Sequence, residues 1–114
     1  MRALRAALAA ITLIGGTVLV AAAPANAAPC GTVHTAHIDG ASAHWKISCG
    51  ENRVKVDGWV QDTRRDAMCA RVTIDTESGS DWPQACGKGK RVVFHESYFD
   101  PHRKGAVVKL MVVY

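Results

Sequence analysis

By type and spacing, the residues best suited to bind a metal are the cysteines and histidines between positions 30 and 49. Cys30, His34, His37, His44 and Cys49 lie close together in sequence, and zinc sites are built from such ligands. In a strand, His34 and His37 point to opposite faces, because they are three residues apart. In an oxidising compartment the cysteines form disulfides in preference to thiolate ligands. We therefore predict no metal and no other cofactor.

Acidic residues suggest a second kind of metal site. Asp75, Glu77 and Asp81 are spaced like the oxygen-rich start of a calcium-binding loop. The third acidic position and the distal glutamate that complete such a loop are missing. A polar surface loop explains the same residues.

Catalytic residues are equally sparse. The chain has no Gly-x-Ser-x-Gly elbow for a nucleophilic serine. Asp57, Asp62 and Asp66 are near one another in sequence, but glycosidase chemistry needs two carboxylates facing each other across a cleft. A domain this small rarely encloses such a cleft. We predict that the chain is not an enzyme, and we keep a small enzyme or toxin using Asp62 and Asp66 as the third alternative.

The tryptophans are the most informative large side chains. Trp45 falls on the apolar face of an expected strand and is assigned to the core, whereas Trp59 falls on a polar face and Trp82 precedes Pro83 in an expected loop. An exposed tryptophan can anchor a protein partner or stack on a sugar ring. Trp59 and Trp82 are therefore candidate partner-binding residues. The alternatives are that Trp82 caps the core and that Trp59 packs under a loop.

Basic residues supply the remaining binding candidates, Lys88, Lys90 and Arg91. Together with the basic residues at 64–65 and 102–104, they would form a patch for an anionic wall polymer if their loops share one end of the domain. A solvated charged rim is the alternative. Positive and negative charges are interspersed along the chain, so we predict no nucleic-acid partner.

The first 27 residues have the pattern of a secretory signal peptide. Arg2 and Arg5 precede an apolar run, and Ala25-Asn26-Ala27 supplies small residues at a cleavage site. The apolar run is shorter than the ~20 residues that a membrane span needs. Removing residues 1–27 lowers the formal net charge from +4 to +2. We therefore predict a secreted, extracellular protein with no membrane attachment after cleavage.

All four cysteines lie in the remaining single domain, residues 28–114. An even number of cysteines in a short exported domain indicates two disulfides, and the sequence allows three pairings. We favour Cys30–Cys49 and Cys69–Cys86, because each closes a loop of intermediate length.

Apolar residues in this domain recur with a period of two, which predicts strands. Turn signals at short intervals support an all-β, antiparallel sandwich or barrel of five to six strands. Strands are expected at 44–49, 54–60, 70–75, 90–99 and 106–114, with a weaker edge strand at 32–38. Residues 77–89 are expected to form a long loop, and the apolar segment 106–114 is expected to be central.

Three short motifs carry a resemblance to known proteins. They are Val56-x-Gly58-x-Val60-x-Asp62, Asp66-x-x-Cys69-Ala70-x-Val72 and Ala85-Cys86-Gly87-x-Gly89. In these the chain resembles a group of small secreted actinobacterial proteins, most of them described only as hypothetical. Some small secreted actinobacterial proteins are adaptors in multi-subunit antibacterial toxin particles, the umbrella toxins, which exemplifies what such a domain can do.

A weaker likeness is to the tendamistat-type α-amylase inhibitors, which are small two-disulfide β-sandwiches. It rests on Trp59, on the acidic residue before Cys69, and on Cys69-Ala70 followed by an alternating strand. Those inhibitors use a Trp-Arg-Tyr triplet, whereas this chain has Trp59-Val60-Gln61 and lacks their C-terminal cysteine. The resemblance implies a similar fold and places amylase inhibition in doubt.

These observations favour a secreted, non-catalytic binding module as the function, with an adaptor in an extracellular complex as its most specific form. An extracellular protein is the expected partner, and a wall polymer or carbohydrate is the alternative ligand. The second hypothesis is an inhibitor of a secreted hydrolase, which would use residues 77–89 as a protruding loop. The sequence does not identify the partner.

Overall fold

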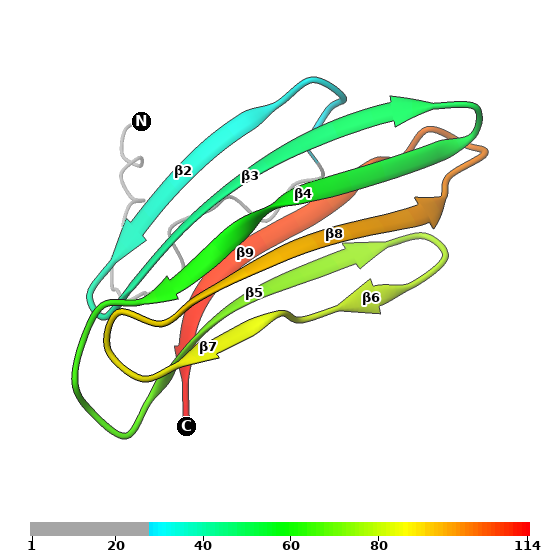
Figure 1. Ribbon diagram of the computed structural model, residues 1–114. Helices are drawn as coiled ribbons and strands as arrows, with labels where there is room; N and C mark the ends of the chain where they lie inside the picture. The colour runs from blue at the N-terminus through cyan, green and yellow to red at the C-terminus, as the bar shows by residue number, and fades with distance from the viewer. Residues whose placement is uncertain (1–27) are drawn as a thin grey trace, which may run out of the picture.

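The computed structural model describes residues 28–114 (Figure 1), so the predicted signal peptide lies outside the described residues. The described chain forms eight strands arranged as two antiparallel sheets. The strands are β2 (Val33–Ile38), β3 (Ala41–Gly50), β4 (Arg53–Asp62), β5 (Cys69–Thr76), β6 (Ser80–Asp81), β7 (Gln84–Cys86), β8 (Arg91–Phe99) and β9 (Ala106–Val113). No helix in this part of the chain has the length and apolarity needed to cross a membrane.

The first sheet has the strand order β2-β3-β4-β8, and we call it sheet one. Its central ladder joins β3 to β4 without interruption from Ala41–Asp62 to Gly50–Arg53. The connecting residues Glu51 and Asn52 have φ angles of 51° and 65°. Two left-handed residues in a two-residue hairpin are typical of a type I′ turn, whose twist matches that of the strands. β2 lies at the edge of this sheet, as the sequence predicted.

The second sheet, sheet two, is built around β5. β9 pairs with β5 over its whole length on one side, while β6 and β7 lie end to end on the other. The expected long loop at 77–89 is therefore wrong, because it contains two strands too short to show an alternating pattern. The link between them stays close to β5, since the Val72 N–H donates to the Pro83 carbonyl at 3.0 Å.

The expected central position of the last strand is also wrong. Within residues 28–114, β9 pairs only with β5, apart from a single bridge between Ala28 and Ala106. Apart from Lys109 the segment is apolar, and its outward residues Val107 and Met111 remain partly covered. A nearly continuous apolar run indicated burial on both sides, but it does not distinguish a central strand from a partly covered edge strand.

The core lies between the two sheets and follows the period-two pattern. Residues such as Ile47, Val56, Val72 and Leu110 are fully buried, and their neighbours along each strand face outward. Trp45 is 2% exposed, which confirms its assignment to the core. It pairs with Gly58 across the β3–β4 ladder, at a position where any Cβ atom would collide with the backbone of β3.

The sandwich has two distinct ends (Figure 1). The turns of the β3–β4, β5–β6 and β8–β9 connections lie at one end, which we call the turn end. The β2–β3 turn and the longer connections at 63–68 and 87–90 lie at the other, the loop end. Each end has one disulfide: Cys30–Cys49 at the turn end and Cys69–Cys86 at the loop end, with Cα–Cα distances of 5.5 and 4.4 Å. The favoured pairing is thus confirmed.

Candidate binding surfaces

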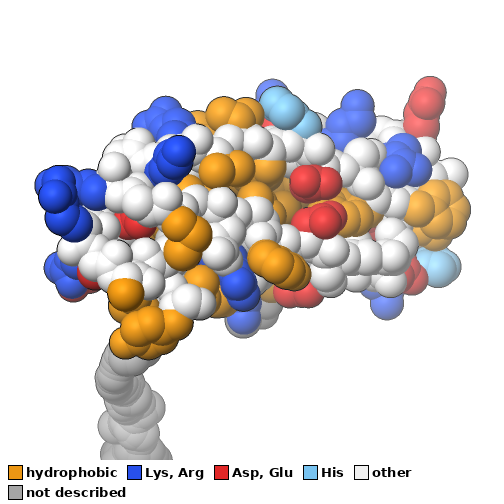
Figure 2. All heavy atoms as spheres, turned by 60° about the horizontal axis from the view of Figure 1, so that its bottom comes forward, with side chains coloured by type: hydrophobic (Ala, Val, Ile, Leu, Met, Phe, Trp, Pro, Cys, Tyr) orange, Lys and Arg blue, Asp and Glu red, His pale blue; other side chains and the backbone are white. Residues whose placement is uncertain are grey.

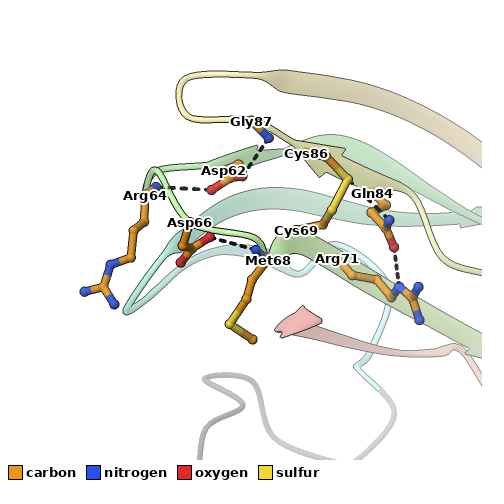
Figure 3. The surroundings of a disulfide bond; sticks show 9 residues. All are labelled: Asp62, Arg64, Asp66, Met68, Cys69, Arg71, Gln84, Cys86 and Gly87. Atoms are coloured by element: carbon orange, nitrogen blue, oxygen red, sulfur yellow. Dashed lines mark hydrogen bonds between the residues drawn. A yellow bond between two sulfur atoms is a disulfide. The ribbon is translucent and has the colours of Figure 1, made fainter. Parts of the chain in front are cut away.

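A buried carboxylate organises the loop end (Figure 3). Asp62, at the end of β4, is 1% exposed, and its two oxygens accept the backbone N–H groups of Arg64 at 3.1 Å and Gly87 at 2.8 Å. The backbone of Asp62 also bonds to the 87–90 connection, because its N–H donates to the Lys90 carbonyl and its carbonyl accepts the Gly89 N–H. Asp62 therefore joins the 63–68 connection to the 87–90 connection.

The three aspartates considered for catalysis do not converge. Asp62 is occupied by the backbone donors just described, and Asp66 is exposed and accepts the Met68 N–H at 2.9 Å. Asp57 lies on the outer face of sheet one and contacts His95 Nδ1 at 2.9 Å. Each of the three aspartates therefore has its own structural contacts, and they do not form the facing pair that glycosidase chemistry needs.

The loops held by Asp62 bring basic side chains together. Arg64, Arg65, Lys88 and Lys90 are all exposed at the loop end, and Arg64 forms an ion pair with Asp39. Figure 2 shows basic side chains gathered at this end of the molecule, on the left. The basic residues of the 102–104 turn lie at the turn end, where His102 bonds to Glu77. The predicted single patch therefore divides into two groups at opposite ends.

Trp59 lies at the centre of the outer face of sheet one, which we call the Trp59 face. The β3–β4 and β4–β8 registers place it between His44 and Val93. The guanidinium carbon of Arg91 lies 3.7 Å from the centre of the Trp59 ring, and the His44 ring stacks beside it at 6.3 Å. Arg91 is held in place by two bonds to Gln61 Oε1, at 2.8 and 3.0 Å. A guanidinium at this distance stabilises the ring by a cation–π interaction.

The rest of the Trp59 face combines exposed apolar residues with paired polar ones. Val33, Val93 and Phe99 are among the most exposed large apolar residues of residues 28–114, and all three have the outward register of Trp59. Polar contacts cross the strands between them. These contacts are Thr35–His44 at 2.9 Å, His37–Ser42 at 2.8 Å, Asp57–His95 at 2.9 Å and Arg53–Ser97 at 2.8 Å. The side chains of this face are therefore ordered before any partner binds.

Trp82 lies on the opposite side of the molecule. It is 60% exposed on the outer side of sheet two, and the Arg71 guanidinium lies 4.5 Å from its ring centre. The alternative that Trp82 caps the core is wrong, because the residues that alternate with it, Asp81 and Pro83, have the inward register.

Of the five predicted partner-binding residues, the structure brings Trp59 and Arg91 into contact, keeps Lys88 and Lys90 nearby at the loop end, and places Trp82 elsewhere.

A cluster that the sequence did not reveal lies on the open side between β6 and β8. The Tyr98 hydroxyl donates to Asp81 Oδ2 at 2.6 Å, and burial together with this bond raises the pKa of Tyr98. Glu96 has the same inward register as Tyr98, and burial followed by the charge of Asp81 raises its pKa, against a smaller opposing effect of His95. The signal in the sequence was a single acidic residue among the apolar positions of β8.

Within residues 28–114, no group of three histidine, cysteine or acidic side chains is placed to hold a metal ion. His34 packs beside Trp45 with ring centres 5.0 Å apart, while His37 lies on the outer face. A shallow hollow of about 280 Å³ lies at the turn end, lined by residues that include Cys30, Asn52 and Asp100. It adjoins the Trp59 face only at the turn end, through Arg53.

Comparison with protein-family models, with curated proteins and with solved structures finds no match to this chain. The resemblances noted from the sequence motifs therefore stay predictions.

Proposed function

We propose that this chain is a secreted, non-catalytic binding module that contacts a protein partner through the Trp59 face. The observation that supports the proposal is the combination at its centre: a tryptophan held by Arg91 and His44, next to exposed Val93. Tryptophan and arginine are the residues most often found at the energetic centres of protein interfaces. Because their positions are already set by cross-strand contacts, binding would cost little side-chain entropy.

A protein partner fits this face better than a sugar does. A sugar ring stacks on an uncovered aromatic ring, whereas the guanidinium of Arg91 already lies over Trp59. Small ligands also favour enclosed sites, and Trp59 lies on an open sheet face. A broad, ordered surface with apolar residues among polar pairs is typical of a protein–protein interface. An adaptor in an extracellular complex is the most specific form of this function.

The inhibitor hypothesis required a protruding loop at residues 77–89, and the structure does not have one there. Residues 77–89 include β6 and β7, which lie along β5 and do not project as a free loop. A protruding, rigid loop is what an inhibitor would insert into a hydrolase active site, and this stretch does not provide one.

The experiment is affinity purification from the native culture medium of the protein carrying a tag after Tyr114, which is 94% exposed. We expect a stoichiometric protein partner with the wild type and its loss with Trp59→Ala. Trp82→Ala is the matched control, since it removes the same side chain from the opposite sheet and should retain the partner. Recovery of the protein alone, or equal capture by both variants, would contradict the proposal.

A further inference from the structure

The edge of sheet one at β8 offers unpaired backbone groups. β8 pairs with β4 on one side, in continuous register from Arg53–Phe99 to Gln61–Arg91. The Asp62 N–H bonds to the Lys90 carbonyl and the Asp100 N–H to the Asn52 carbonyl, which extend the same ladder. In an antiparallel ladder, hydrogen-bonded and non-hydrogen-bonded pairs alternate. The N–H and C=O groups of Val93, His95 and Ser97 therefore point away from β4, where no strand of residues 28–114 lies.

This edge lacks most of the features by which proteins protect exposed strands. β8 has nine residues, contains no proline, and keeps a regular register with no bulge. Proline, bulges, short strands and inward-pointing charges are the usual protections. Only the last of these is present, in Glu96, which occupies the same inward register as Phe94 and Tyr98.

Glu96 has a second carboxylate close by. Asp81, on β6 of sheet two, accepts the Tyr98 hydroxyl and thereby lies beside the inner side of the β8 edge. Figure 2 looks at the molecule from this side and shows acidic side chains gathered midway along it. No basic side chain of residues 28–114 forms an ion pair with Glu96 or Asp81.

We propose that the β8 edge binds an extended segment of another protein as an added strand, with a lysine or arginine of that segment facing Glu96 and Asp81. Strand addition supplies affinity through the main chain and specificity through alternate side chains. A residue directly opposite Glu96 would have its Cβ about 5 Å away, within reach of an ion pair. This edge borders the Trp59 face, because Val93, His95 and Ser97 contribute side chains to that face and backbone groups to the edge, but the pairing does not require Trp59.

A second copy of this chain fits the edge poorly. Two β8 strands paired antiparallel about their middle would place the two Glu96 side chains directly opposite or diagonal to each other. Both carboxylates would then move away from water next to a like charge, which is unfavourable. The same charge that opposes self-pairing favours a partner strand with a basic residue.

Two synthetic peptides test the proposal with the intact protein. Each is a nine-residue strand of alternating threonine and valine, with a central lysine in the valine row of one peptide and a glutamate there in the other. Titration followed by amide resonances and hydrogen exchange gives affinity and location together. We expect the lysine peptide to bind about fivefold more tightly and to protect the amides of Val93, His95 and Ser97. Glu96→Lys should reverse the preference.

A backbone variant separates edge pairing from charge attraction. Ser97→Pro removes an N–H that faces the open edge and should abolish peptide binding, while Ser97→Ala keeps that N–H and should retain binding. If Ser97→Pro fails to fold, the reversed peptide preference of Glu96→Lys still tests the proposal. Equal affinity for the two peptides, protection at β2 in place of β8, or protection of the β8 amides by self-association would overturn the proposal. Peptide binding that persists in Trp59→Ala would show that the edge acts independently of the Trp59 face.

Discussion

The two ends of the sandwich are built from the same parts and held in different ways. Each has one disulfide and one buried aspartate: Asp62 at the loop end and Asp100, 3% exposed, at the turn end. Asp100 accepts the N–H groups of Lys104 and Gly105, both at 2.9 Å and both within its own turn. Asp62 accepts one N–H from its own loop and one from Gly87, in a connection far along the chain.

The difference shows that a buried carboxylate can serve either a local or a long-range purpose. At the turn end, the aspartate shapes a single turn whose strands are already joined in sequence. At the loop end, it holds two separate connections together and so determines where their basic side chains lie. Losing each aspartate should therefore have different consequences.

The largest expected effect comes from Asp62→Ala. The two connections lose the buried carboxylate that joins them, together with two charge-assisted hydrogen bonds, which should lower the free energy of unfolding by about 4 kcal/mol. Asp100→Ala should cost less, about 2 kcal/mol, because both of its N–H donors lie within one short turn and no second connection is released. Urea unfolding measures both values.

Asp66→Ala is the control for Asp62→Ala, since it removes an exposed carboxylate from the same loop and should cost under about 1 kcal/mol. Equal losses for Asp62→Ala and Asp100→Ala would contradict the distinction between long-range and local roles.

The disulfides give the next largest effect. Replacing Cys69 and Cys86 together by alanine should cost about 3 kcal/mol, since the bridge closes a loop with a sequence separation of 17. The Cys30–Cys49 bridge, with a separation of 19, should contribute a similar amount to stability. Only the first double variant should speed amide exchange in the 87–90 connection, because β7 has three residues and depends on the bridge. Equal acceleration in both variants would argue against separate ends.

The smallest effect concerns Glu96, a carboxylate between the two ends that faces another acid in place of backbone N–H groups. Its pKa in the folded protein is raised above the ordinary 4.5, so its contribution favours the folded state at low pH and is lost as the pH rises through the raised pKa. At pH 7, Glu96→Gln should therefore raise Tm by roughly 1–3 °C. The difference should vanish near pH 4.

Thermal scans at both pH values provide this measurement. Glu51→Gln is the matched control, because it removes the same charge from an exposed turn. A lower Tm for Glu96→Gln at pH 7 would show that the Glu96 carboxylate is stabilised in the folded protein.

The sequence predicted the long strands and both disulfides, because period-two alternation and an even cysteine count each have few structural solutions. It missed β6 and β7, because two or three residues are too few to show alternation. The sequence also did not predict that Asp62 joins two connections, because its second partner, Gly87, is close only after both sheets have formed. Trp59 was placed on the correct face of β4, but its contact with Arg91 depends on the β4–β8 register, which no local pattern specifies.

The β3–β4 hairpin has a consequence for the order in which the chain folds. Its turn has two residues, Glu51 and Asn52, already in the left-handed conformation that a type I′ hairpin uses, and its ladder is built from near neighbours in sequence. Closing so short a loop costs little entropy, whereas pairing β4 with β8 requires the intervening chain to be gathered first. We therefore expect folding to start at the turn end and to reach the loop end last, when Gly87 arrives at Asp62.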